Sequence, residues 1–181
     1  MTSVQHDQIH RLARHYLEPG PVVLISSRYG GTVNVMTCGW HQMLGWSRMS
    51  CLISPANHSH AMIRESGVAV INVPAADMLD TLVDIGNCSG ADTDKFARFG
   101  LERETAQVDA PGIAQCWAQL DCRITDPALI ERYDLFVFDV VAIRAVPGER
   151  PQTAHYLGDG EFLLSGRTVS KRERFRPEML L

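Results

Sequence analysis

The sequence predicts a mainly β protein with peripheral helices, in which six or seven antiparallel strands close into a barrel. Its 181 residues are 45% hydrophobic and 21% charged, as in an ordinary soluble domain, and this length fits a single domain. Apolar β-branched runs follow one another across short turns, which favours antiparallel pairing. The segments show neither a repeat nor the regular strand–helix alternation of a parallel sheet. Barrel closure is expected because it removes the exposed edges of such a sheet.

The N-terminal third is predicted to hold one helix and three strands. Residues 4–17 place apolar side chains on one helical face, and the Pro-Gly-Pro sequence that follows ends this helix. Apolar runs at 22–27 and 32–38 flank a Gly-Gly pair, a pattern typical of a β-hairpin. A third strand is predicted at 50–54.

The rest of the chain is predicted to hold helices and strands of irregular length, followed by a polar tail. The next helix would begin with Asn57 or Ser59 as its N-cap and end before Gly67. The predicted elements are a helix at 59–66, a strand at 68–73, helical pieces at 78–83 and 94–99, strands at 113–125 and 135–146, and a tail at 167–181. Residues 1–181 are expected to form a single domain, with the N-terminal helix within 1–17.

Charge and hydrophobicity exclude several classes of function. The net charge of −4 gives no attraction to polyanions, so we expect no nucleic-acid partner. No apolar run reaches the ~20 residues needed to cross a bilayer, and the polar N-terminus lacks the hydrophobic region of a signal peptide. Five scattered cysteines without a CxxC pair are typical of reduced intracellular thiols. We therefore expect a cytoplasmic protein with no membrane partner.

The chain also lacks the motifs of several common catalytic sites. The nucleophile elbow, the phosphate loop, the dinucleotide fingerprint and the zinc-protease helix are all missing from the sequence. A hydrolase is therefore not predicted, and no catalytic side chain is assigned from these motifs.

Polar residues interrupt the apolar strand predicted at 32–38. Strand amides beside Asn34 and Thr37 can hydrogen-bond the edge of a flat heteroaromatic ligand, while Trp40 or Trp46 supplies a wall. The alternative is a hairpin strand with two solvent-facing polar residues and a core tryptophan. The candidate ligand-binding residues of this segment are Asn34, Met36, Thr37, Cys38 and Trp40.

A second candidate site precedes the helix predicted at 59–66. A helix N-terminus offers free N–H groups and a partial positive charge. Ser59 and the histidines His58 and His60, with Arg64 one turn further on, would therefore form a binding site for an anion or a phosphate. Ordinary capping by Asn57 or Ser59 explains these residues equally well. His58 and His60 are two positions apart, a spacing that separates their side chains on a helix, so no metal site is predicted.

A third candidate site is the turn that leads into the second of the two helical pieces. Gly90 allows close approach of the backbone, and Ser89 and Lys95 can complete a phosphate contact. Asp92 and Asp94 favour a simpler explanation, since acidic residues in a first helical turn complement the helix dipole.

Taken together, these segments resemble the flavin reductase-like family, specifically its flavoredoxin-type branch, which has an FMN-binding split β-barrel. The resemblance covers roughly residues 18–166 and rests on the order and spacing of six short segments. These are Pro21 to Ile25, Asn34 to Trp40, Ser54-Pro55 with Ser59 to Gly67, Val70 to Pro74, Ser89-Gly90 with Asp94 to Phe96, and His155 to Gly160.

The resemblance implies that the cofactor is FMN. The isoalloxazine would lie against the segment from Asn34 to Trp40, and the phosphate would be held by His58, Ser59 and the turn from Ser89 to Lys95. Ser54 belongs to the same set of implied binding residues. The resemblance also implies a homodimer with the flavin near the subunit interface.

The function implied is that of an FMN-dependent oxidoreductase. It would transfer electrons between NAD(P)H or another donor and flavin or a downstream acceptor, such as an electron-acceptor protein or a monooxygenase. Many flavin reductases carry Gly-Asp-His before the late strand, with the His near the nicotinamide, whereas this chain reads Arg132-Tyr133-Asp134. A non-catalytic carrier, storage or sensor protein that binds flavin or haem is therefore the alternative. An enzyme like pyridoxamine-phosphate oxidase is a further, minor alternative, because the Arg/Lys-rich substrate motif of such enzymes is not found in this sequence.

Overall fold

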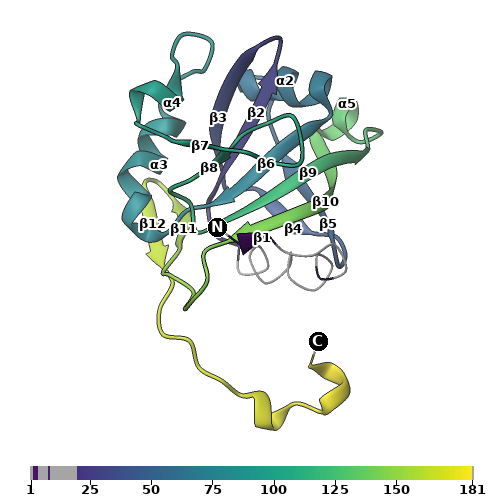
Figure 1. The fold of residues 1–181 in the computed structure, drawn as a ribbon, viewed down its shortest axis with the longest axis vertical. Coiled ribbons are helices and arrows are strands. Elements are labelled where there is room, and N and C mark those ends of the chain that lie inside the picture. Colours follow the sequence, from purple (N-terminus) through teal and green to yellow (C-terminus); the bar gives the residue numbers. More distant parts are fainter. Residues whose placement is uncertain (1, 4–7, 9–19, 181) are drawn as a thin grey trace.

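One strongly curled antiparallel sheet forms the centre of the computed structural model, which describes residues 2–3, 8 and 20–180 (Figure 1). Its strands follow the order β3 (Thr32–Cys38), β2 (Val23–Tyr29), β6 (Val68–Val73), β9 (Ala118–Asp126), β10 (Leu135–Ala145), β5 (Arg48–Leu52) and β4 (His41–Met43). The short strand β1 (Thr2–Ser3) pairs with β10. The predicted fold class, mainly β and antiparallel, is confirmed.

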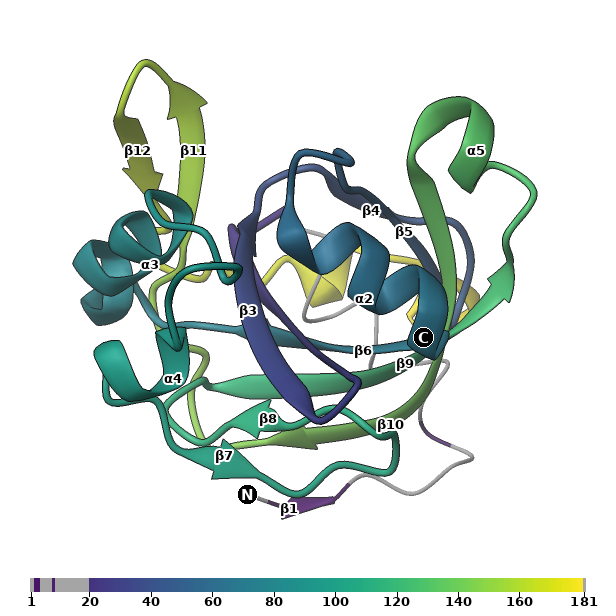
Figure 2. The ribbon, with the colours of Figure 1, turned by 90° about the horizontal axis from the view of Figure 1, so that it is seen from above.

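The barrel is split between the two ends of the sheet. Strands β3 and β4 are the ends of the strand order. Helix α2 (His58–Ser66) lies across this opening, against β2 and β3 (Figure 2). The start of α2 is thereby brought beside the outermost strand of the sheet.

The first part of strand β2 is buried on both faces, which explains the apolar run from Val22 to Ile25. Val23 and Ile25 point into the barrel core, whereas Val22 and Leu24 belong to a second core. That second core includes Leu82 and other side chains of the helices outside the sheet. A strand covered on both faces shows no polar alternation, so its sequence reads as a continuous hydrophobic run.

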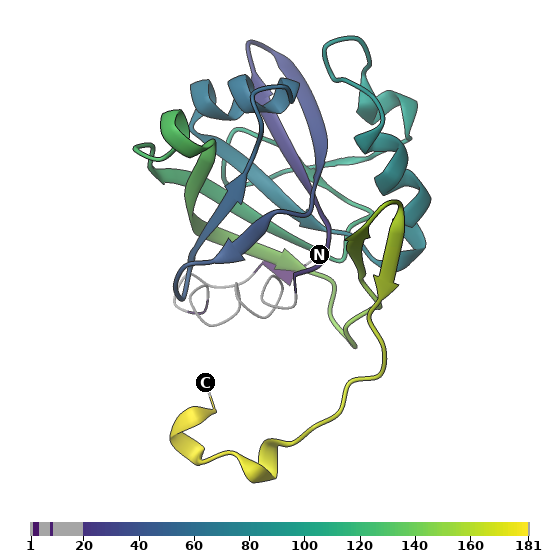
Figure 3. The same cartoon turned by 180° about the vertical axis from the view of Figure 1, so that it is seen from behind.

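The remaining elements cover the outside of the barrel (Figure 3). The 3-10 turn η2 (Ala76–Met78) leads into α3 (Leu79–Gly86), and α4 (Lys95–Arg98) follows; both helices contact β3. Strands β7 (Arg103–Glu104) and β8 (Gly112–Ile113) form one small sheet, and β11 (Ala154–Gly158) and β12 (Glu161–Leu164) form another. Helix α5 (Ile130–Tyr133) precedes β10.

The structure corrects the predicted strand at 113–125. The chain turns at Cys116, whose amide bonds the carbonyl of Ile113 at 3.0 Å, so β8 and β9 are separate strands. Apolar side chains continue through this turn because it packs in the second core, and they conceal the break in the sequence. The predicted strand at 50–54 begins earlier, at Arg48. Strands β4, β7, β11 and β12 and helix α5 were not among the predicted elements.

Among the described residues, the two ends of the chain lie outside the barrel sheet, apart from β1. The predicted helix at 4–17 falls outside the described residues apart from position 8. The tail carries two 3-10 turns, η3 (Arg172–Arg174) and η4 (Pro177–Met179), and runs away from the barrel (Figure 1). No helix among the described residues has the length and apolar character needed to span a membrane.

Candidate functional site

Strand β3 lies between two helices and sends polar side chains to both of them. Asn34, Met36 and Cys38 share one face of the strand because side chains alternate, and Asn34 Nδ2 donates a hydrogen bond to Ser59 Oγ of α2 at 2.9 Å. Thr37 lies on the other face, where its hydroxyl donates to the carbonyl of Leu82 in α3 at 2.7 Å. The two polar residues that interrupt this strand thus hydrogen-bond to helices: Asn34 is buried and Thr37 is half-buried.

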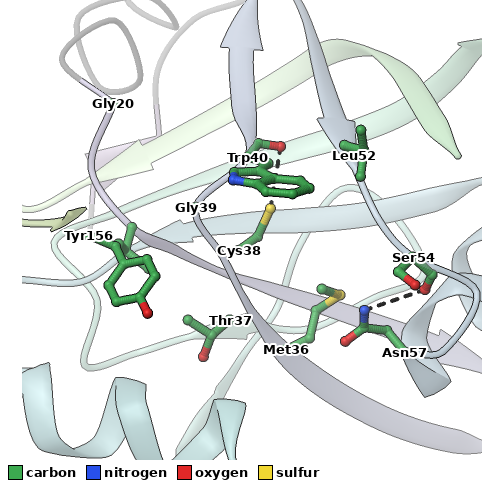
Figure 4. A pocket seen from close by; sticks show the side chains of 11 residues that line it. Gly20, Met36, Thr37, Cys38, Gly39, Trp40, Leu52, Ser54, Asn57 and Tyr156 are labelled. Carbon is green, nitrogen blue, oxygen red and sulfur yellow. Dashed lines mark hydrogen bonds between the residues drawn. The ribbon is translucent and has the colours of Figure 1, made fainter. Parts of the chain in front are cut away.

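An uncharged pocket of about 320 Å³ opens beside the C-terminal half of β3. Trp40 and Tyr156 stand on different sides of it (Figure 4). No Lys, Arg, Asp or Glu lines this pocket among the described residues, so a neutral planar group can enter it without desolvating a charge. The lining residues are Gly20, Val22, Met36, Thr37, Cys38, Gly39, Trp40, Leu52, Ser54, Asn57 and Tyr156.

A polar pocket of about 190 Å³ adjoins the uncharged one, and Met36 and Asn57 line both. Three elements meet in it: β3, the start of α2, and the turn between α3 and α4. Its lining residues are Asn34, Met36, Ala56, Asn57, His58, Ser59, Gly86, Asn87, Cys88, Ser89, Gly90 and Lys95. The two pockets together form one continuous candidate site.

The side-chain amide of Asn34 is the centre of the polar pocket. It is 2% exposed, and its Oδ1 has no hydrogen-bond partner among the described residues. A Cβ on Gly90 would lie 2.0 Å from this oxygen, so the backbone of the turn packs directly on the amide. A buried carbonyl oxygen without a donor is costly, which indicates that a ligand or water group completes this site.

The start of α2 lines the polar pocket with residues 56–59. Asn57 occupies the N-cap position, but its side chain makes no capping bond to the helix. It donates instead to the carbonyl of Ser54 at 3.4 Å. The first amides of a helix have no intrahelical acceptor, and they favour an anion through the helix dipole. The prediction of Asn57 as the N-cap residue is therefore confirmed for its position, although its side chain makes no capping bond.

Lys95 is a buried cation in the wall of the polar pocket. The residue is 4% exposed. Its Nζ donates a hydrogen bond to the carbonyl of Ile85, near the C-terminus of α3, at 2.9 Å. Burial lowers the pKa of Lys95. One of the three ammonium donors is committed to the helix end, and the others remain for a ligand.

The two histidines near the start of α2 point to different surroundings. His58 lines the polar pocket. His60 packs edge-on against Phe136, with its Nε2 3.5 Å from the Asp134 carboxylate. Of the residues predicted to form the anion site, His60 therefore lies outside the pocket lining, as does Arg64, which pairs with Glu131 at 2.7 Å.

Cys38 and Trp40 form the wall at the end of β3. The hydrogen bond from the Cys51 thiol lowers the pKa of Cys38, although burial acts in the opposite direction. Trp40 is 72% exposed, so it is a wall facing solvent and not the core tryptophan of the alternative interpretation. Trp46, the other candidate wall, does not line either pocket.

All eleven residues predicted to bind a ligand line one of the two pockets. The uncharged pocket takes Met36, Thr37, Cys38, Trp40 and Ser54, and the polar pocket takes Asn34, Met36, His58, Ser59, Ser89, Gly90 and Lys95. Leu52 and Tyr156 also line the uncharged pocket, and their roles there were not predicted. Tyr156 reaches it from the β11–β12 hairpin, a contact that no local spacing in the sequence indicates.

Comparison with known proteins assigns this architecture to a family. The chain matches the flavin reductase like domain over residues 14–162. It is 30% identical over 150 residues to an uncharacterized protein of Archaeoglobus fulgidus, covering 80% of this chain and 85% of that one.

Solved structures agree with this match. An FMN-binding domain of a flavin reductases-like enzyme from Shewanella baltica has a TM-score of 0.80 and 29% identity, covering 93% of this chain and 96% of that one. Flavoredoxin of Desulfovibrio vulgaris shares the fold, with a TM-score of 0.74 and 19% identity over 84% of this chain and 90% of its own. With a fold and a domain match that agree over most of its length, the chain belongs to the flavin reductase-like family.

Proposed function

We propose that the protein binds FMN across the two pockets and acts as an oxidoreductase. The observation that carries this proposal is the junction at Met36 and Asn57 of an uncharged pocket with a polar one built on a helix start. A flat ring system with a phosphorylated chain has the same division into a neutral and an anionic part. The Shewanella baltica relative, described as an FMN-binding domain, supports the choice of ligand.

The residues of both pockets fit this cofactor. The unpartnered Oδ1 of Asn34 can accept a hydrogen bond from a hydroxyl of the ribityl chain. Ser59, whose Oγ already accepts from Asn34, can donate its hydroxyl proton to a phosphate oxygen. Because Gly90 has no side chain, its backbone can pack against the Asn34 amide without displacing it from the pocket lining.

When bound, FMN would supply the electron-transfer chemistry. The residues of the chain bind and orient: the outer edge of β3 offers backbone groups to the ring, and Thr37 holds that edge against α3. Trp40 and Tyr156 limit the access of water to the uncharged pocket. The amides at the start of α2, together with His58 and Lys95, bind the phosphate.

The electron donor would be NAD(P)H or another reductant, and the acceptor free flavin, a protein or a monooxygenase. A non-catalytic flavin carrier is the second candidate, because Asp134 stands where many flavin reductases have a histidine. Asp134 adopts a left-handed backbone conformation with φ of 54° directly before β10.

The five cysteines are free thiols, as expected for the cytoplasmic location that we predict.

A second copy of the chain would cover the mouth of the uncharged pocket. Trp40 and Tyr156 are exposed there, and Leu157 on the same hairpin is 67% exposed. Neighbouring exposed side chains of this kind usually mark an interaction surface. We use the name apolar face for the exposed apolar side chains that line this pocket or stand on the β11–β12 hairpin: Trp40, Leu52, Tyr156, Leu157, Leu163 and Leu164.

The cofactor proposal is tested by titrating the purified protein with FMN. We expect one FMN per chain, with the flavin fluorescence changed on binding and the visible absorption retained after desalting. A protein that takes up no FMN under any loading condition would refute the proposal. Oxidation of NADH or NADPH in the presence of free FMN then separates the two candidates: turnover supports a reductase, and tight binding without turnover supports a carrier.

A further inference from the structure

The C-terminal arm, residues 167–180, extends from the body of the molecule. The chain is fixed at Ser165, whose amide and hydroxyl hydrogen-bond the backbone of Thr153 at 2.8 Å each. Beyond this point it leaves β12 and runs below the barrel without returning to α3 (Figures 1 and 3). Residues 167–179 are all exposed, including the apolar side chains of Val169, Phe175 and Met179.

The arm is strongly basic in an acidic protein. It carries five of the 17 Lys and Arg residues of the chain but two of its 21 Asp and Glu residues. The described ion pair within it joins Arg176 to its neighbour Glu178 at 3.5 Å. The basic residues are Arg167, Lys171, Arg172, Arg174 and Arg176.

An acidic stretch of the chain has the opposite character, and its segment from Gly86 to Gly90 lines the polar pocket. Residues 65–94 contain no Lys or Arg. Five exposed aspartates lie on η2, α3 and the turn before α4, and we call them the acidic rim: Asp77, Asp80, Asp84, Asp92 and Asp94. Asp94 caps α4 by accepting a hydrogen bond from the Ala97 amide at 3.1 Å, and its exposed charge stays on the rim.

The polar pocket is poorly supplied with positive charge for a phosphate. His58 and Lys95 are the residues of its lining that can carry a positive charge. Lys95 is buried and bonded to Ile85, and burial lowers its pKa. A phosphate dianion bound here by one chain alone would lack the guanidinium groups that usually accompany such sites.

We propose that the C-terminal arm of one copy lies on the acidic rim of a second copy and brings arginine to its polar pocket. The proposal rests on the FMN site proposed above and names the partner that completes its phosphate end. Fourteen extended residues span up to about 45 Å, enough to reach a neighbouring subunit. The β11–β12 hairpin that carries the arm belongs to the apolar face, so the arm leaves the body at the proposed dimer contact.

Three arm variants test this proposal with FMN and riboflavin as paired ligands. In the first, the chain ends after Gly166. The second carries Arg172→Gln, Arg174→Gln and Arg176→Gln, and the matched control carries Glu173→Gln and Glu178→Gln. Because riboflavin lacks the phosphate, we expect the first two variants to lose FMN affinity by about tenfold or more, a loss of about 1.4 kcal/mol, and to bind riboflavin as before. The control should bind both ligands as the unaltered protein does.

Mixing two defective chains tests whether the arm acts between copies. A chain that ends after Gly166 keeps an intact pocket, and a chain with Gly90→Ala keeps an intact arm. Their mixture, refolded together, should regain tight FMN sites that neither chain forms alone. A mixture that regains none would show that the arm serves its own chain and would overturn the proposal.

Other outcomes separate this proposal from the one before it. Unchanged FMN affinity in the first two variants would overturn the role of the arm while the FMN site stands. Equal losses of FMN and riboflavin affinity would also overturn it, since the arm would then support the fold or the dimer and not the phosphate. If the unaltered protein binds neither ligand, the proposed FMN site itself is wrong.

Discussion

At the scale of single residues, Gly90 and Asn34 determine the shape of the polar pocket. Asn34 is held by Ser59, and the backbone of Gly90 packs on the other side of its amide. This contact joins β3, α2 and the turn before α4 at one point. The absence of a side chain at position 90 is therefore a requirement of packing, since no Cβ fits without displacing Asn34.

Gly90→Ala is expected to destabilise the protein and to weaken FMN binding. The new Cβ would lie 2.0 Å from Asn34 Oδ1, and overpacking of this kind costs about 1–3 kcal/mol. Urea unfolding and FMN titration measure the two effects. Gly166→Ala is the matched control, because nothing lies within 4 Å of its added Cβ. Wild-type stability and affinity in Gly90→Ala would contradict the packing described for Asn34.

Local sequence indicated Asn34 and Thr37 as candidate site residues, and both line the pockets, but it gave no indication for Tyr156. Polar side chains inside an apolar strand need partners, and this need is visible in the sequence alone. Tyr156 lies about 120 residues further on, in a hairpin whose place depends on the packing of Phe162 against the second core. Contacts of this kind depend on the assembled fold and have no local signal.

At the scale of elements, a buried ion pair ties the small β7–β8 sheet to the barrel. Arg144 of β10 makes two bonds to the Asp121 carboxylate of β9, at 2.6 and 2.7 Å. Its guanidinium also donates to Gln119, and Gln119 donates to Glu104 of β7 at 2.8 Å. The amide of Gln107 bonds Asp121 at 2.7 Å, so the network also holds the loop between β7 and β8.

Arg144→Met is expected to cost about 3–5 kcal/mol of unfolding free energy, because it leaves the fully buried Asp121 carboxylate without its counter-ion. The double variant with Asp121→Leu should recover much of this loss, since it removes the stranded charge. Arg48→Met, which breaks the exposed pair with Asp139, is the control and should have a much smaller effect. Urea unfolding checks all three. Equal losses from Arg144→Met and Arg48→Met would show that burial does not set the strength of the pair.

The predictability of an element depended on its length and on where its partners lie. β2 and β6 were predicted because each is a run of buried apolar residues bounded by turns. Three-residue β4 and four-residue α5 are too short to produce a period, and β4 exists because β5 pairs with it. The break between β8 and β9 was not predicted. The backbone turns there, with the Cys116 amide hydrogen-bonded to the Ile113 carbonyl, but both side chains stay in the second core, so the apolar pattern of the sequence continues.

At the scale of the whole molecule, the apolar face accounts for many of the exposed large hydrophobic side chains. We expect the protein to be a dimer by light scattering and Leu157→Asp to shift it toward the monomer, because a buried charge would oppose association. Tyr29→Asp is the control: Tyr29 is 49% exposed in the β2–β3 turn, at the other end of the barrel (Figure 1). A monomeric unaltered protein, or equal dissociation in both variants, would contradict this surface.

The arrangement of the five thiols provides a chemical reporter on the polar pocket. Cys38, Cys51, Cys116 and Cys122 are buried, whereas Cys88 is half-buried in the lining of that pocket. Burial also raises the pKa of Cys116 and Cys122, which slows their reaction with alkylating reagents. A maleimide or aromatic disulfide added to the native protein should therefore label one position rapidly, and inorganic phosphate or FMN should protect it. Peptide mapping of the labelled chain would locate the adduct without any measurement of redox activity.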